Sequence, residues 1–136
     1  MIRTGLLISL VAALAACSSG PNPARSLNDP VVQRLFALPT AEMYGTMRAS
    51  QRIAAACSAY RYDAALEQVL NERRVASEGQ VAVLRARDGI PLYADVLSRE
   101  FQARHNAVIG QDDVCPGADA EYAAGSALSA ALVPVR

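Results

Sequence analysis

Three cysteines and one histidine are the most reactive side chains of this 136-residue chain. The thiols of Cys17, Cys57 and Cys115 could form a disulfide, bind a metal or act as nucleophiles. His105 is the only histidine, so any Ser-His or Cys-His mechanism would need it as the base. The chain has no lysine and no Cys-x-x-Cys or His-x-x-x-His spacing, which argues against Schiff-base, redox and zinc chemistry. We therefore expect no catalytic residue, no metal and no cofactor, and we expect His105 to be a solvated residue at a helix end.

Cys17 ends a segment with the pattern of an export signal. Arg3 is followed by an apolar run over residues 6–14, which is too short to span a bilayer, and then by small residues. Leu14-Ala15-Ala16-Cys17 resembles the lipobox of bacterial lipoproteins, in which the thiol of the first mature residue carries diacylglycerol. An ordinary signal peptide, with Cys17 incidental, is the alternative.

The lipobox resemblance implies a signal peptide over residues 1–16 and attachment to a membrane through lipid on Cys17. Several acyl chains would make such an anchor effectively permanent. Ser18 stands where an Asp would signal retention in the inner membrane, so the resemblance implies the cell envelope, at the periplasmic face of the outer membrane.

Cys57 and Cys115 remain as an even pair once Cys17 is lipidated, and an oxidising compartment favours a disulfide between them. They lie 58 positions apart, and closing a loop of that length would stabilise the fold by about 4 kcal/mol. Two separately buried thiols and a redox-active pair are the alternatives.

Two other clusters combine polar side chains with a loop or turn. Tyr60, Arg61 and Tyr62 have the composition of an interaction hot spot, although an inter-helix turn with half-buried tyrosines explains them too.

The carboxylates around Cys115 suggest a calcium site, but their spacing does not match an EF-hand, and turn and cap roles explain them better. These carboxylates belong to Asp112, Asp113, Asp119 and Glu121, with Asp119 expected as a helix N-cap.

The elements that would position these residues are helices. The chain is 52% hydrophobic but only 5% aromatic, without tryptophan, and no stretch alternates well enough to predict a strand. We expect an all-α fold, a small bundle of about four to five helices with one disulfide. Residues 17–29 would be a solvated, lipidated tether, and residues 30–136 a single helical domain. The expected helices cover about residues 30–38, 41–60, 64–88, 91–106 and 120–132, with the third bent or broken at Gly79 and one bent helix favoured.

The position of Cys57 in an early helix and of Cys115 just before the last one resembles an uncharacterised family of small exported bacterial helical proteins. Most of the similarity lies in the last helix. The matching residues there are Ala120, Glu121, Ala123, Ser126 and Leu132. The resemblance implies the disulfide and the all-α fold, and it implies no activity.

The formal net charge is zero, so the sequence has no basic footprint for nucleic acid. Together with the absence of catalytic spacings, these features predict a non-enzymatic, membrane-anchored periplasmic lipoprotein. We expect it to bind, or to assist the assembly of, another envelope protein. A periplasmic chaperone or inhibitor whose helices open under acid stress is the alternative. An envelope hydrolase that uses His105 or an Asp pair is the second alternative.

Overall fold

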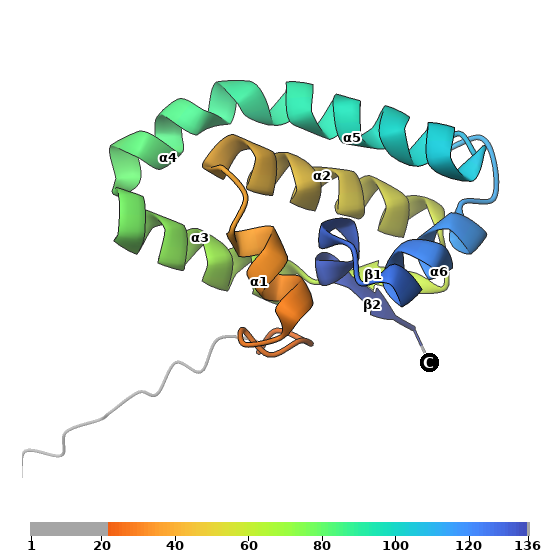
Figure 1. The fold of residues 1–136 in the computed structure, drawn as a ribbon, viewed down its shortest axis with the longest axis horizontal. Coiled ribbons are helices and arrows are strands. Elements are labelled where there is room, and N and C mark those ends of the chain that lie inside the picture. The colour runs from red at the N-terminus through yellow and green to blue at the C-terminus, as the bar shows by residue number, and fades with distance from the viewer. Residues whose placement is uncertain (1–21, 136) are drawn as a thin grey trace, which may run out of the picture.

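The computed structural model describes residues 22–135, so Cys17 and the export signal lie outside the described residues. The fold is helical, with one short two-stranded sheet (Figure 1), which confirms the predicted all-α class with its disulfide. None of the helices in this part of the chain is long and apolar enough to cross a membrane. The helices are α1 Pro30–Phe36, α2 Thr40–Ala56, α3 Ala64–Glu78, α4 Gln80–Ala86, α5 Ile90–His105 and α6 Cys115–Ala124, with the 3-10 turns η1 Arg87–Gly89 and η2 Ala127–Ala131 and the strands β1 Tyr60–Tyr62 and β2 Leu132–Pro134.

Local chemistry explains several helix ends. The carboxylate of Asp29 accepts the Val31 N–H at 2.8 Å, with Pro30 at the first position of α1. Asp63 caps α3 in the same way, through the Leu66 N–H at 3.0 Å. At the end of α5, Asn106 adopts a left-handed conformation with φ of 49°, a role that asparagine tolerates well. These boundaries confirm the sequence prediction.

Gly79 separates α3 from α4, so the expectation of one long helix over residues 64–88 is wrong. Its φ of 86° and ψ of 151° lie far from helical values, and a side chain there would be strained. The chain therefore turns at Gly79, and α4 leads through η1 into α5. Figure 1 shows α4, η1 and α5 as one outer arc of the molecule.

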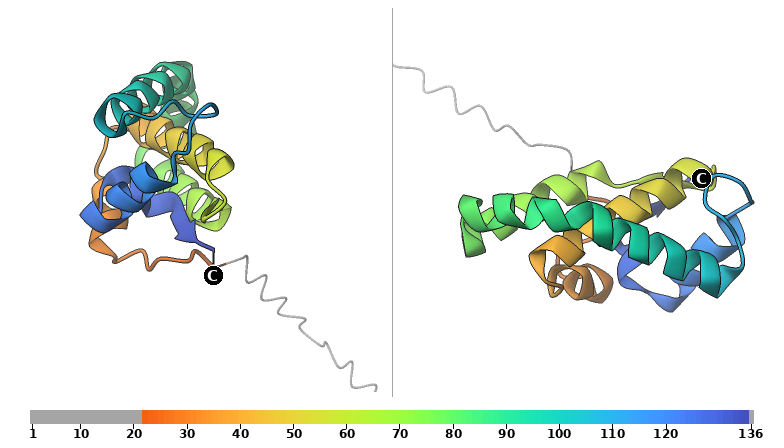
Figure 2. Two further views of the ribbon diagram at one scale, coloured as in Figure 1. Left: turned by 90° about the vertical axis from the view of Figure 1, so that its right-hand side faces the viewer. Right: turned by 90° about the horizontal axis from the view of Figure 1, so that it is seen from above.

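Helices α2 and α5 form the centre of the fold and run side by side in the same direction (Figures 1 and 2). Gly45 lets them approach, because a Cβ at this position would lie 2.4 Å from the Cβ of Tyr93. The core has two clusters, one at each end of α2. One surrounds the disulfide and includes Ile53 and Phe101, and the other joins α1, α2 and α3 around Met43.

The C-terminal part differs from the expected single helix over residues 120–132. α6 begins at Cys115 and ends at Gly125, which adopts a left-handed φ of 60°. The chain then turns through η2, and β2 pairs antiparallel with β1, with Tyr62 opposite Leu132. The expectation of no strand is therefore wrong. Three-residue strands show no alternation long enough to read from sequence, and their pairing depends on where the last helix stops.

The segment expected as a solvated tether contacts the domain from Ala24 onward. The Ala24 N–H donates to the Asp63 carboxylate at 2.7 Å, and the Arg25 guanidinium lies 4.6 Å above the centre of the Tyr122 ring. Leu27 packs against the second core cluster. The folded domain therefore begins before Pro30, and the part of the predicted tether from Cys17 to residue 21 lies outside the described residues.

Candidate functional site

The structure joins Cys57 and Cys115 in a disulfide, with their Cα atoms 5.1 Å apart, and this confirms the predicted pair. Cys57 is the C-cap residue of α2, and Cys115 is the first residue of α6. Cys57 is fully buried, and both sulfurs lie in or against the first core cluster. The bond therefore ties the end of the central helix to the C-terminal third of the chain.

His105 is not the solvated cap that the sequence predicts. Its ring packs on Phe101 with centroids 4.7 Å apart, and its Nε2 lies 2.7 Å from Oε1 of the buried Glu121. Gly117 makes room for it, since a Cβ there would lie 3.0 Å from the Cβ of His105. Sequence reasoning missed this pair because its members are 16 positions apart on two helices that meet only in the fold.

The His105–Glu121 pair holds a buried carboxylate rather than activating a nucleophile. Burial alone would raise the pKa of Glu121, but the hydrogen bond with His105 and the charge of Arg104 bring this pKa below its usual value. Arg104 Nε lies 3.2 Å from the same carboxylate oxygen. Within residues 22–135 no serine or threonine hydroxyl hydrogen-bonds to His105, so the ring lacks the partner of a Ser-His mechanism.

The carboxylates around Cys115 serve the local backbone and do not converge. Asp112 accepts the Val108 N–H at 2.7 Å, and Asp113 accepts the Cys115 N–H at 3.0 Å, as expected for turn roles. Asp119 is not an N-cap, because α6 starts four residues earlier. In the described part of the chain, no group of three or more His, Cys, Asp or Glu side chains could hold a metal ion.

The structure corrects the predicted interaction patch of Tyr60, Arg61 and Tyr62. Tyr60 is buried, its hydroxyl donates to Asp119 at 2.7 Å, and burial together with this bond raises its pKa to about 12. The Tyr62 hydroxyl donates to Glu67 at 2.8 Å, and burial raises its pKa as well. Because successive side chains of β1 alternate, only Arg61 is exposed. Tyr60 is therefore closed off from the surface and Tyr62 is half-buried, which agrees better with the alternative of a turn with half-buried tyrosines than with an open patch.

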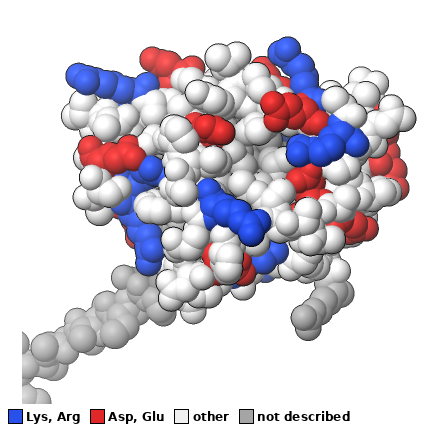
Figure 3. All heavy atoms as spheres, viewed as in Figure 1, with Lys and Arg blue, Asp and Glu red and all other residues white. Residues whose placement is uncertain are grey.

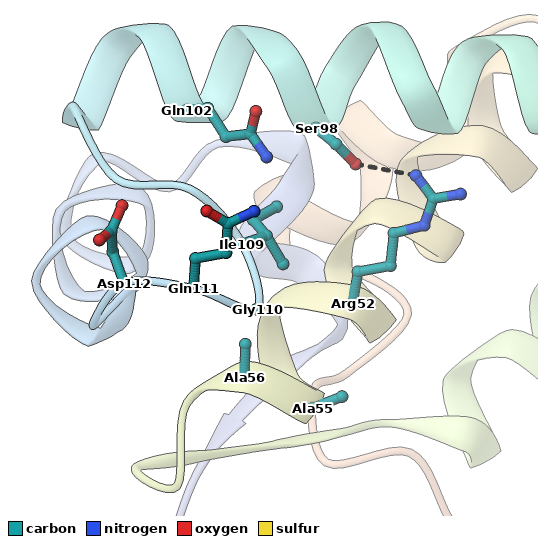
Figure 4. Close-up of a pocket in the computed structure, with 9 residues that line it drawn as sticks. All are labelled: Arg52, Ala55, Ala56, Ser98, Gln102, Ile109, Gly110, Gln111 and Asp112. Atoms are coloured by element: carbon teal, nitrogen blue, oxygen red, sulfur yellow. Dashed lines mark hydrogen bonds between the residues drawn. The ribbon is translucent and has the colours of Figure 1, made fainter.

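Two hollows on the exposed side of α2 share Arg52 and Ala55, and we call them together the α2 groove. The first, of about 670 Å³, lies between α2, α5 and the loop after α5 (Figure 4). The second, of about 1130 Å³, lies between α2, α3, α4 and the start of α5. Polar residues that line the first hollow include Ser98, Gln102, Gln111 and Asp112, and those of the second include Tyr44, Arg48, Gln51, Glu67, Asn71 and Arg87.

Arginine and amide side chains dominate the chemistry of the α2 groove. Figure 4 shows Arg52 reaching from α2 toward α5, where its guanidinium donates to Asp95 at 2.7 Å and to Ser98 at 3.2 Å. Arg48 and Arg87 also line the groove, and neither has a carboxylate within 4.0 Å among residues 22–135. The sequence prediction missed the groove, because its walls come from four helices and a loop.

A second unexpected surface is a row of apolar side chains on α4 and α5, which we call the outer stripe. Val81 and Leu84 lie three residues apart on α4, Leu92 and Val96 lie four residues apart on α5, and the four are 62%, 46%, 65% and 39% exposed. The buried residues of the same two helices, Val83, Ala94 and Phe101, occupy other positions than the exposed ones. The sequence signal for the stripe was therefore this second set of apolar positions at helical spacing.

The charged side chains do not define a site on their own. On the face shown in Figure 3, positive and negative groups are interspersed and form no extended patch of one sign. This agrees with the zero net charge of the chain. No protein-family model, curated protein or solved structure matches the chain.

Proposed function

We propose that this chain is a non-enzymatic lipoprotein of the bacterial envelope, anchored by lipid on Cys17 at the periplasmic face of the outer membrane, which binds another envelope protein. The observation that carries the proposal is the outer stripe. Four exposed aliphatic side chains on two successive helices are more than a solvated surface needs, and exposed apolar groups of this kind are typical of a protein-protein contact. The enclosed position of His105 supports a binding role over catalysis.

The position of the N-terminal segment supports this reading. Residues 22–29 lie below α1 and α6, on the side of the domain opposite the outer arc of α4 and α5 (Figures 1 and 2). Only five steps of chain separate Cys17 from Asn22, which can span at most about 18 Å. A lipid on Cys17 would therefore hold the domain close to the membrane, with α4 and α5, which carry the outer stripe, on the far side of the domain, where a partner in the periplasm could reach them.

The partner expected from this surface is a protein with an apolar groove or helix of similar length. Burying the remaining exposed half of each aliphatic side chain contributes about 1 kcal/mol, so two of them contribute about 2 kcal/mol. Removing two should therefore weaken binding by about thirtyfold.

The test uses the full chain, expressed with its own export signal in its native envelope and recovered with bound proteins after mild crosslinking. We expect the double variant Leu84→Ser/Leu92→Ser to lose a specific set of crosslinked proteins, measured by quantitative mass spectrometry. The matched control, Ala76→Ser/Ala123→Ser, changes exposed positions on α3 and α6, outside the stripe, and should retain them. Equal recovery with both variants would refute the proposal, and so would recovery of nothing but further copies of this chain.

The lipid anchor has a separate measurement. The mature protein extracted from membranes should begin at Cys17 and should exceed the mass of residues 17–136 by a diacylglycerol and an amino-terminal acyl chain. An unmodified thiol on a chain cut elsewhere would contradict the anchor while leaving the contact surface open to the crosslinking test.

A further inference from the structure

The α2 groove is distinct from the outer stripe and has different chemistry. We propose that this groove binds an extended polypeptide segment that carries carboxylates. Its shape, its charges and its amide groups each support this ligand, and none of them depends on the function proposed for the outer stripe.

The length of the α2 groove fits a short stretch of extended chain. Along α2 the lining residues run from Tyr44 to Ala56, which is twelve helical steps of 1.5 Å each, or about 18 Å. An extended polypeptide rises about 3.3 Å per residue, so five or six residues would fill it. The two hollows share Arg52 and Ala55, so one chain can pass from the first to the second.

The charges of the larger hollow favour an anionic ligand. Three guanidinium groups line it, from Arg48, Arg52 and Arg87, against the single carboxylate of Glu67. Asp95 already pairs with Arg52 at 2.7 Å, and Glu67 accepts a hydrogen bond from Tyr62. Arg48 and Arg87 therefore remain as cations on two sides of the hollow, one on α2 and one on η1, without a carboxylate within 4.0 Å in the described part of the chain.

The amide groups distinguish a peptide from other anions. Gln51 and Asn71 line the larger hollow, and Gln102 and Gln111 line the smaller one. A primary amide both donates and accepts, so it can pair with the N–H and C=O groups of an extended backbone. Among residues 22–135, Tyr44 is the only aromatic residue that lines either hollow, and its hydroxyl donates to Asn71 at 2.6 Å, so the stacking faces that sugars or bases would use are scarce.

The test measures fluorescence anisotropy of a fluorescein-labelled hexapeptide of alternating glutamate and alanine, mixed with the mature protein in nonionic detergent. We expect saturable binding that weakens as the salt concentration rises, and no saturable binding of the matched peptide with glutamine in place of glutamate. The double variant Arg48→Gln/Arg87→Gln should bind the acidic peptide about tenfold more weakly. Arg73→Gln, which removes an exposed charge of α3 outside the groove, should change the affinity by less than twofold.

Other outcomes would overturn the inference. Equal binding of the acidic and the glutamine peptide, unchanged affinity in the double variant, or no saturable binding at all would each do so. Trigalacturonate, a sugar with three carboxylates, serves as a competitor, and displacement of the peptide at equal concentration would assign the groove to carboxylated sugars instead. The variant Leu84→Ser/Leu92→Ser should bind the peptide normally, which separates this result from the test of the outer stripe. Thermal unfolding followed by circular dichroism verifies that each variant is folded.

Discussion

Replacing Gly45 by alanine should destabilise the protein, although the same change usually stabilises a helix. Alanine is favoured over glycine in a helix interior by about 1 kcal/mol. At position 45, however, the new Cβ would lie 2.4 Å from the Cβ of Tyr93 and 3.1 Å from the Ala94 nitrogen. A Cβ is fixed to its backbone, so no rotamer change of Tyr93 relieves the contact. The two central helices would have to separate by about 1 Å to reach an ordinary distance of 3.4 Å.

Overpacking of this kind costs about 3 kcal/mol at the upper end of its usual range, which leaves a net loss of about 2 kcal/mol after the helical gain. For a domain of this size we expect the melting temperature to fall by about 8 °C. Urea unfolding followed at 222 nm measures the free energy directly. Gln51 is exposed in the middle of the same helix, so comparing Gln51→Ala with Gln51→Gly gives the propensity difference without a clash. A Gly45→Ala protein as stable as the parent would refute the close approach of α2 and α5.

Three further substitutions test other parts of the fold. Replacing both Cys57 and Cys115 by serine opens a 58-residue loop and should lower the free energy of unfolding by about 4 kcal/mol, and a loss below 1 kcal/mol in urea titrations would contradict a stabilising bond. Glu121→Gln should make the free energy of unfolding depend less on pH in the acid range. The pKa of Glu121 is lowered in the folded state, so its carboxylate stabilises the fold above the unfolded pKa of about 4.3, and this contribution is lost as the pH falls through the folded pKa. Unfolding titrations from pH 6 down to 3 check this, and parallel curves for variant and parent would disprove it. Gly117→Ala should displace the Phe101 and His105 rings, because a Cβ would lie 2.7 Å from the Phe101 ring and 3.0 Å from Cγ of His105, and unchanged histidine ring chemical shifts in NMR spectra would count against this packing.

The sequence was most informative where the structural cause is local. Asp29 before Pro30, Asp63 before α3 and Asn106 after α5 act on backbone groups within a few residues, so their roles were predicted correctly. The disulfide was predicted from counting thiols in an oxidising compartment, which needs no knowledge of the fold. The helical class followed from composition and periodicity alone.

Predictions were wrong where distant segments compete for the same space. Gly79 fitted either a bent or a broken helix, and the packing of α4 and α5 along α2 selected the break. Helix periodicity places Val96 and Phe101 on α5, but which of them faces α2 depends on the rotation of the whole helix. Tyr60 and Tyr62 were candidates for an interaction patch, with half-buried tyrosines in a turn as the alternative, and pairing with β2 leaves Tyr60 buried and Tyr62 half-buried.

The two candidate binding surfaces show the same division. The sequence by itself determined the residues of the outer stripe and their helical spacing, together with the arginines and amides of the α2 groove. Only the tertiary structure decided that the stripe is left exposed on helices that lie opposite the N-terminal segment, and that Arg48, Arg52 and Arg87 line one hollow. The reason is that spacing along a helix is a local property of the backbone, whereas burial and the meeting of side chains depend on the sum of many weak contacts between segments far apart in the chain.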